Sequence, residues 1–223
     1  IFRKAGTAVI GIDDEHCRRM RDDLARAGRI RIITISGASA AADIYVEGRR
    51  LIDRTGTEPV VVADLARAAA LPGAHNGQNA AAACAAVRAL GLEAETAARG
   101  LLTFPGLAHR QELIATIGGV RYINDSKATN AEAAGHALDS YVTIYWIAGG
   151  VPKAGGIVAL APLFPRIAHA FLIGAAAQDF ARTLEGRVSH TLSGDLAAAL
   201  RAAHAAAQRS ERRPAVVLLS PAC

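Results

Sequence analysis

Four short apolar runs in the second half of this chain each end in a polar or glycine-rich segment. They occupy residues 118–123, 141–148, 169–173 and 215–219. Helix-like stretches lie between them at residues 131–138, 175–184 and 194–209. Strand-like runs that alternate with helical periodicity predict βα units on a parallel sheet. Since the carboxyl ends of parallel strands meet at one edge of the sheet, we expect an α/β domain whose polar loops converge there.

The loop after the first run carries the most functional groups. Residues 124–130 are Asn-Asp-Ser-Lys-Ala-Thr-Asn, which places a carboxylate, hydroxyls and an ammonium just before a helix. A helix N-terminus has unpaired N–H groups and a partial positive charge, so this loop suits an anionic ligand. An ordinary capped turn, with Thr129 or Asn130 as the N-cap, also explains these residues.

Two more runs end in segments of the same character. The second run leads into residues 149–156, in which four glycines surround Lys153. Glycines let the backbone approach a ligand closely, and the lysine ammonium can reach an anion. The last run ends in Ser-Pro-Ala-Cys at residues 220–223. Ser220 has no base near it in the sequence, so we do not expect it to act as a nucleophile.

The first half predicts a smaller mixed region. Strands are expected at residues 7–12, 30–36, 43–46, 50–53 and 60–62, and helices at residues 14–27, 76–90 and 92–101. The segment Leu102–Gly106 then interrupts the pattern, and its proline and glycine suit a hinge. We therefore expect one domain at residues 1–103 and a second at residues 104–223.

Several segments, in order along the chain, resemble the motifs of the Mur ligase family. They are Val9–Asp14, His75–Ala80 (His-Asn-Gly-Gln-Asn-Ala), Gly106–Arg110, Asn124–Asn130, Gly149-Gly150 with Lys153, and Leu218–Cys223. The resemblance runs the whole length of the chain. It implies that residues 1–103 are the later part of a Mur-ligase central ATP-binding domain. Residues 104–223 would then be most of a Rossmann-like, parallel-sheet C-terminal domain that receives the amino acid.

The resemblance implies an ATP-dependent amide ligase of peptidoglycan synthesis. Such an enzyme phosphorylates a carboxylate to an acyl phosphate, which an amine then displaces, and positive charge must follow the transferring phosphoryl group. The motifs favour D-glutamate as the amino acid and UDP-N-acetylmuramoyl-L-alanine as the acceptor.

The resemblance also assigns roles to single residues. Arg110 and Lys127 would be catalytic at the ATP phosphates, and Asp125 would bind the ribose hydroxyls. Asn76 and Asn79 would bond the adenine, because an amide both donates and accepts. The residues that match D-glutamate contacts are Thr129, Lys153 and Ser220, with Lys153 opposite a carboxylate.

The family's phosphate loop is not among these 223 residues, since no Gly-Lys-Ser or Gly-Lys-Thr occurs in them. By the resemblance, the N-terminal domain, the Mg²⁺ ligands and the extreme C-terminus also lie outside the chain. We therefore interpret the chain as a fragment of an ATP- and Mg²⁺-dependent enzyme, and we assign no metal ligand within it.

Alternatives stay open at this point. Another Mur ligase or a folylpolyglutamate synthase would share the fold and the ATP chemistry, and a non-catalytic nucleotide-binding module would share the fold alone. Asn76 could simply cap the following helix, and Arg110 and Lys127 could be surface charges. His75 and His109 are expected to be hydrogen-bonded structural residues. The residues that follow Gly149-Gly150 depart from the family pattern, which leaves the conformation of that loop open.

Composition excludes several classes. The net charge of +5 is small and is spread over both halves of the chain. Residues 1–103 carry 14 basic and 12 acidic side chains, and residues 104–223 carry 11 basic and 8 acidic side chains. We expect Arg18–Arg21 and Arg49-Arg50 to lie on solvated surfaces, and we expect no nucleic-acid partner. No signal peptide or long apolar run predicts a membrane association. The three cysteines are odd in number and lack metal spacing, so we expect reduced thiols in the cytoplasm. We also expect a monomer.

One prediction follows from the missing phosphate loop. These 223 residues alone should not ligate D-glutamate and should bind ATP only weakly, because adenine and ribose contacts remain without an anion cradle. Calorimetric titration with ATP and an assay of phosphate release would measure both. Turnover by this chain alone would contradict its interpretation as a fragment.

Overall fold

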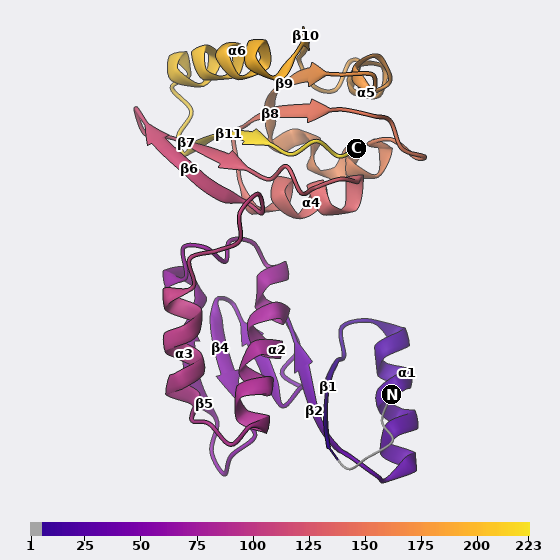
Figure 1. Cartoon of the computed structure of the whole chain (residues 1–223), viewed down its shortest axis with the longest axis vertical. Coiled ribbons are helices and arrows are strands. Elements are labelled where there is room, and N and C mark those ends of the chain that lie inside the picture. The colour runs from indigo at the N-terminus through magenta and orange to yellow at the C-terminus, as the bar shows by residue number, and fades with distance from the viewer. Residues whose placement is uncertain (1–5) are drawn as a thin grey trace. The chain divides into compact units, whose positions relative to one another are not determined.

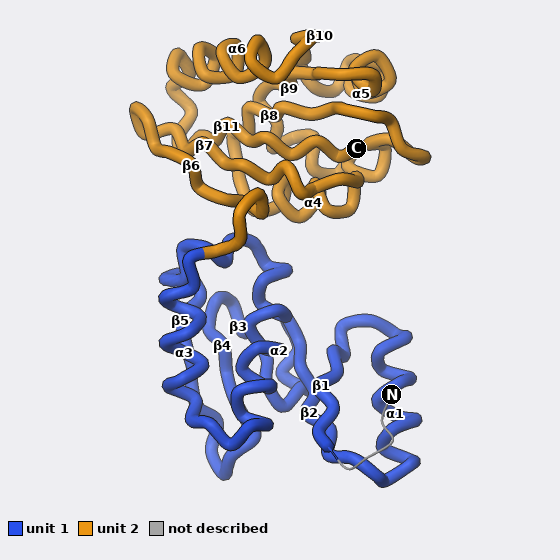
Figure 2. The backbone as a smooth tube through the Cα atoms, viewed as in Figure 1, with its two compact units in different colours: residues 1–105 blue, residues 106–223 orange. Residues whose placement is uncertain are grey.

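The computed structural model describes residues 6–223 of the chain. The chain divides into two compact units, residues 1–105 and residues 106–223, which Figure 2 colours separately. Each unit has its own β-sheet and its own hydrophobic core. No core cluster of the described residues draws members from both units.

Unit 1 contains a five-stranded sheet in the order β1-β2-β3-β4-β5. The strands are β1 (Thr7–Gly11), β2 (Arg31–Ser36), β3 (Ile44–Glu47), β4 (Arg50–Asp53) and β5 (Val60–Asp64). The first three pair in parallel, while β3, β4 and β5 pair as antiparallel neighbours. Buried and partly buried residues alternate along β1, as expected for a strand with one face on the core.

Small residues allow the helices of unit 1 to pack closely on this sheet. The helices are α1 (Glu15–Ala27), α2 (His75–Ala89) and α3 (Ala94–Thr103), with a short 3₁₀ turn η1 (Leu65–Arg67). The α2 face that meets the sheet buries Ala80, Ala81 and Cys84 completely or nearly so. At Gly77, a Cβ atom would lie 3.3 Å from Val46 Cγ2, so glycine brings the start of α2 tightly against β3.

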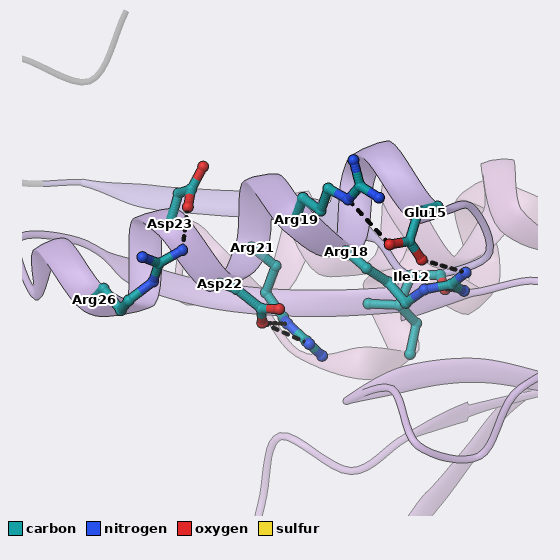
Figure 3. A network of polar contacts seen from close by, with 8 residues as sticks. All are labelled: Ile12, Glu15, Arg18, Arg19, Arg21, Asp22, Asp23 and Arg26. Carbon is teal, nitrogen blue, oxygen red and sulfur yellow. Dashed lines mark hydrogen bonds and ion pairs between the residues drawn. The ribbon is translucent and has the colours of Figure 1, made fainter.

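The arginines of α1 are paired within the helix itself (Figure 3). Glu15 accepts hydrogen bonds from Arg18 and Arg19, one turn further along. Arg26 pairs in the same way with Asp23. The N-cap of the helix is Asp14, whose side chain accepts from the Cys17 amide at 2.9 Å, and its C-cap is Gly28 in the left-handed conformation. The positive charge of this segment is thus largely balanced locally.

Arg49 differs from the solvated arginine that the sequence suggested. It lies in the tight β3–β4 hairpin, as expected, but its guanidinium donates to the carbonyls of Leu65, Leu71 and Gly73 at 2.7 to 2.9 Å. These carbonyls belong to the irregular segment between β5 and α2. A planar fork of five N–H donors can satisfy several such acceptors at once, so Arg49 anchors that segment. Arg50 is exposed.

Unit 2 contains a six-stranded sheet in the order β10-β9-β8-β11-β7-β6. The strands are β6 (Glu112–Ile117), β7 (Val120–Asn124), β8 (Ile144–Gly149), β9 (Ile167–Ile173), β10 (His190–Gly194) and β11 (Ala215–Leu219). All neighbours pair in parallel except β6, which is antiparallel to β7. The expected α/β fold with a parallel sheet is confirmed, with one antiparallel edge strand added.

Helices cover both faces of the unit 2 sheet (Figure 1). They are α4 (Ala131–Ser140), η2 (Val158–Arg166), α5 (Ala177–Leu184) and α6 (Leu196–Arg209). The first three share a core cluster on one face, and α6 packs on the other through Ala199, Ala203 and Ala207. Right-handed crossovers produce this split, since the chain moves one way along the sheet from β7 to β10 and back to β11. Every residue of the central strand β8 is consequently buried.

The two edge strands were missed in the sequence. None of the six residues of β6 is fully buried, and Ile114 is 60% exposed. The apolar side chains of β6 therefore do not alternate between core and solvent. The sequence of β10 is His-Thr-Leu-Ser-Gly, which lacks an apolar run. An edge strand pairs on one side only and needs little apolar burial, which removes the signal on which strand prediction depends.

Gly149, at the end of β8, should be intolerant of substitution. Its φ is 120°, and a Cβ atom there would lie 2.0 Å from the Ile173 carbonyl oxygen. We expect Gly149→Ala to lower the free energy of unfolding by about 2–5 kcal/mol, from backbone strain and steric overlap together. Trp146 is the sole tryptophan and is buried in unit 2, so its fluorescence in a urea titration would report the loss.

Gly155 provides the matched control. Its φ is also positive, at 85°, but no atom lies within 4 Å of the place that a Cβ would occupy. Gly155→Ala should therefore cost only the backbone term, about 1–2 kcal/mol. Equal losses for the two variants would contradict the proposed steric contact at Gly149.

Candidate active site

Four loops of unit 2 are bonded together at the carboxyl ends of its parallel strands. They comprise residues 106–111, 125–130, 149–156 and 220–223, and are called the carboxyl-edge loops below. Backbone bonds join Asp125 N to Leu219 O (2.8 Å), Ala222 N to Ala128 O (2.9 Å), Gly149 N to Pro221 O (2.9 Å) and Lys127 N to His109 O (3.1 Å). The expected convergence of polar loops at one edge is confirmed.

Asp125 lies at the centre of these loops and is only 6% exposed. One carboxylate oxygen, Oδ2, accepts from the Ser220 hydroxyl at 2.9 Å. The other, Oδ1, accepts from the backbone N–H of Gln111 at 3.1 Å. A buried carboxylate is costly unless it is hydrogen-bonded, and these two donors come from different loops. Asp125 therefore holds three segments of the chain in register.

Ser220 is fully buried directly after β11. Its backbone is held on both sides, because its N–H donates to Ile147 O at 3.1 Å and its carbonyl accepts from Trp146 Nε1 at 2.8 Å. The indole belongs to β8, the neighbouring strand. Ser220 thus has a fixed orientation, with its hydroxyl directed at Asp125.

The turn before β6 has an unusual backbone. His109 and Gln111 adopt positive φ angles of 65° and 45°, which are uncommon for residues other than glycine and recur at functional sites. Glu112 accepts from the His109 N–H at 2.8 Å, and Asn124 Nδ2 is 2.9 Å from His109 Nδ1. His109 is therefore a hydrogen-bonded residue, as expected. The turn presents the Gln111 N–H to Asp125.

Two positive side chains extend from these loops into solvent. Arg110 and Lys127 are exposed, and neither forms an ion pair with any residue of the described range 6–223. Arg110 is close enough to Asp125 for its charge to favour the ionised carboxyl. Two exposed cations that form no ion pair within the described residues can attract an anion such as a phosphate.

A second group of side chains surrounds the 149–156 loop. Lys153 Nζ donates to the Thr129 carbonyl, which connects this loop to the one after β7. Cys223 packs beside Gly150, where a Cβ atom would be 3.3 Å from Cys223 Cβ. Partial burial raises the pKa of the Cys223 thiol, and the Lys153 charge opposes this. Thr129, Lys153 and Cys223 thus lie close together at the carboxyl edge.

Asn130 is the N-cap of α4, because its Oδ1 accepts from the Ala133 N–H at 2.8 Å. Of the two N-cap residues that the sequence suggested, Asn130 is thereby confirmed. This leaves the Thr129 hydroxyl free of the capping role. Helix α4 begins at Ala131, directly after the loop that carries Lys127 and Thr129.

Asn76 and Asn79 lie in unit 1, near the start of α2. Asn76 Nδ2 donates to the Pro72 carbonyl at 2.6 Å, and Asn79 Nδ2 donates to Asn76 Oδ1 at 3.2 Å. The idea that Asn76 caps the helix was wrong, since α2 begins at His75 and its N-cap is Ala74 without a side-chain bond. Asn76 points back along the chain instead, and the two amides orient each other.

Sequence reasoning missed several residues that position the site. Gln111 acts through its backbone N–H and Trp146 through its indole N–H, so neither has a motif that would identify it. Glu112, the first residue of β6, follows Arg110 closely and could have been noticed as a charged residue next to the motif. Contacts of this kind depend on strand order, which places residues 111, 125 and 220 together.

No group of three or more His, Cys, Asp or Glu within residues 6–223 is arranged to hold a metal ion. None of the described helices is long and apolar enough to cross a bilayer. An apolar groove of about 500 Å³ lies beside α6, where Leu196, Leu200 and His204 face Ile114 and Ile117 of β6. The side chains expected at the site do not line this groove, so it is separate from the carboxyl-edge loops.

Comparison with known sequences identifies the family of this chain. No protein-family model matches the chain. The UDP-N-acetylmuramoylalanine--D-glutamate ligase of Caulobacter sp. (strain K31) is 52% identical over 221 residues, which are 99% of this chain and 47% of that protein. The protein of the same name from Rhodospirillum rubrum is 50% identical over 227 aligned positions, with 100% and 48% covered. The chain belongs to the Mur ligase family.

This Mur ligase chain spans about half the length of the curated relatives it matches. Solved structures share its fold at low identity. MurF from Acinetobacter baumannii has a TM-score of 0.66 at 19% identity, over 97% of this chain and 49% of that one. Folylpolyglutamate synthase from Mycobacterium tuberculosis, in complex with ADP and AMPPCP, has a TM-score of 0.69 at 16% identity, over 97% and 52%.

The buried carboxyl of this Mur ligase chain should make its stability depend on pH. Burial raises the pKa of Asp125 above its ordinary 3.8, and the bonds from Ser220 and Gln111 and the charges of Arg110 and His136 oppose this in part. A raised pKa means that the folded state binds the proton more tightly. The stability gained is fully present below pH 3.8 and is lost as pH rises through the raised pKa.

Asp125→Asn removes this titration and keeps an acceptor oxygen. The free energy of unfolding of the wild type, minus that of Asp125→Asn, should therefore fall as the pH rises from below 3.8 towards neutrality. Urea titrations at a series of pH values, monitored through Trp146, would measure the difference. A difference that stays constant or grows with pH would contradict the burial argument.

Proposed function

We propose that the full-length protein is an ATP-dependent ligase that adds D-glutamate to UDP-N-acetylmuramoyl-L-alanine in peptidoglycan synthesis. The observation that carries this proposal is the 50–52% identity, over at least 99% of the chain, to relatives named for that reaction. Residues 1–103 would be the later part of the ATP-binding domain and residues 104–223 most of the amino-acid-binding domain. We place the protein in the cytoplasm as a monomer.

Residues of each unit are assigned to the nucleotide. Asn76 and Asn79 would bond the adenine through the amide groups that their mutual contact leaves available. Asp125 would accept from the ribose hydroxyls with its remaining lone pairs. Arg110 and Lys127 would stabilise the negative charge on the transferring phosphoryl group, because they are exposed cations that form no ion pair within the described residues.

The amino acid would bind on the side of the 149–156 loop. Lys153 supplies a positive charge opposite a glutamate carboxylate, while Thr129 and Ser220 belong to the two loops bonded beside it. The amine must then attack an acyl phosphate held between these residues and the two phosphate-side cations. Orientation of the two reactants at one sheet edge is the main contribution of unit 2 to the reaction.

Mg²⁺ is expected for phosphoryl transfer of this kind, but residues 6–223 offer no ligand set for it. A related activity, that of a folylpolyglutamate synthase, has the support of the fold alone, at 16% identity. The much higher identity to the D-glutamate ligases favours the first proposal.

Lys153 provides a direct test in the full-length enzyme. A charge-assisted hydrogen bond to a carboxylate is worth about 1.5–3 kcal/mol, and about 1.4 kcal/mol corresponds to a factor of ten. Lys153→Ala should raise the KM for D-glutamate about ten- to hundredfold and leave the KM for ATP nearly unchanged. Steady-state kinetics with each substrate varied in turn would measure both constants.

Two variants serve as controls for this experiment. Lys153→Arg should recover only part of the loss, since a planar fork does not replace a compact ammonium. Lys127→Ala should affect ATP and not D-glutamate. If Lys153→Ala raised the KM for ATP alone, the assignment of the 149–156 loop to the amino acid would be wrong.

A further inference from the structure

The bond between Ser220 and Asp125 joins residues assigned to different substrates. We propose that Ser220 is a positioning residue for Asp125, so that a hydroxyl in the loop beside the amino-acid site sets how firmly the ribose is held. This inference rests on the proposed function, in which Asp125 binds the ribose hydroxyls. The motif of Ser220 suggests a contact with D-glutamate. Under this inference Ser220 has a second role, in nucleotide binding.

The geometry commits the Ser220 hydroxyl to Asp125. A serine has one hydroxyl proton, and here it is donated to Asp125 Oδ2 at 2.9 Å, in a fully buried position. A substrate carboxylate can only accept, so it would have to compete for that same proton. The bonds from Ser220 N–H to Ile147 O and from Trp146 Nε1 to Ser220 O prevent the backbone from moving away.

Asp125 depends on this hydroxyl for its orientation. An ionised carboxylate has about four lone-pair positions, and Ser220 and Gln111 occupy one on each oxygen. The two donors fix the plane of the carboxylate and leave one position on each oxygen for a ribose hydroxyl. With the Ser220 hydroxyl removed, only the Gln111 N–H would hold the group, and it could rotate about its last side-chain bond.

The surrounding contacts extend the link towards the amino-acid side. The residues after Ser220 are bonded to both neighbouring loops, through Pro221 O with Gly149 N and through Ala222 N with Ala128 O, each at 2.9 Å. Those loops lead to Lys153 and Thr129. Ser220 therefore lies between the proposed nucleotide site and the proposed amino-acid site. A substitution at Ser220 should affect the kinetics with ATP as well as with D-glutamate.

The experiment compares two nucleotides in the full-length enzyme. ATP carries both ribose hydroxyls, and 2′,3′-dideoxy-ATP carries neither. Ser220→Ala should lower kcat/KM for ATP about five- to twentyfold, the effect of weakening hydrogen bonds to a charged group. At saturating D-glutamate, the value for dideoxy-ATP should change less than about twofold, because no ribose hydroxyl is there to be oriented. The preference for ATP, which is the ratio of kcat/KM for ATP to kcat/KM for dideoxy-ATP, should therefore fall.

A purely structural role would lower kcat/KM for both nucleotides equally and would overturn the inference. It would also be overturned if Ser220→Ala affected only the KM for D-glutamate. Thr129→Ala is the matched control, since it alters the amino-acid side and should leave the preference for ATP unchanged. If Ser220→Ala does not fold, Ser220→Cys retains a weak donor of similar size and should give a smaller reduction in the preference.

Asp125→Ala separates this inference from the proposed function. If Asp125 binds the ribose, Asp125→Ala should abolish the preference for ATP, and adding Ser220→Ala should change the preference no further. An active Asp125→Ala enzyme that keeps the full preference would refute the ribose assignment itself. Absence of D-glutamate-dependent turnover in the wild type would refute the proposed function, and calorimetric titration with ADP and its dideoxy analogue would still test the role of Ser220.

Discussion

The buried carboxylate of Asp125 is the interaction on which the order of the carboxyl edge depends. It accepts from Ser220 after β11 and from Gln111 before β6, and it follows β7 directly. Three strands that are neighbours in the sheet are thereby joined at their ends. A carboxylate in such a place is stable only with its partners present, so these loops are arranged around it as one unit.

The position of β11 makes this arrangement possible. It lies between β7 and β8 although it is the last strand in the sequence, and it pairs in parallel with both. The residues that follow it, 220–223, therefore pass between the loops after β7 and β8. Lys127 belongs to the loop after β7, and Lys153 belongs to the loop after β8. Such a switch in strand order is where open α/β sheets bind ligands.

Glycine and strained residues allow the loops to approach each other. Gly149 accommodates the Ile173 carbonyl, and Gly150 accommodates Cys223, in spaces that a side chain would fill. His109 and Ala222 adopt left-handed backbone angles without being glycine. Conformations of this kind carry a cost that the surrounding bonds must offset, and they recur where a site needs fixed geometry.

The sequence by itself determined the fold class, the strands of the sheet interior and the residues that meet at its edge. Apolar runs such as 144–149 are buried on both faces, and this burial dictates their composition. Tertiary structure alone decided the edge strands β6 and β10, the anchoring role of Arg49 and the bond from Ser220 to Asp125. The physical reason is that edge strands need little apolar burial, while the other two depend on groups brought together from distant parts of the chain.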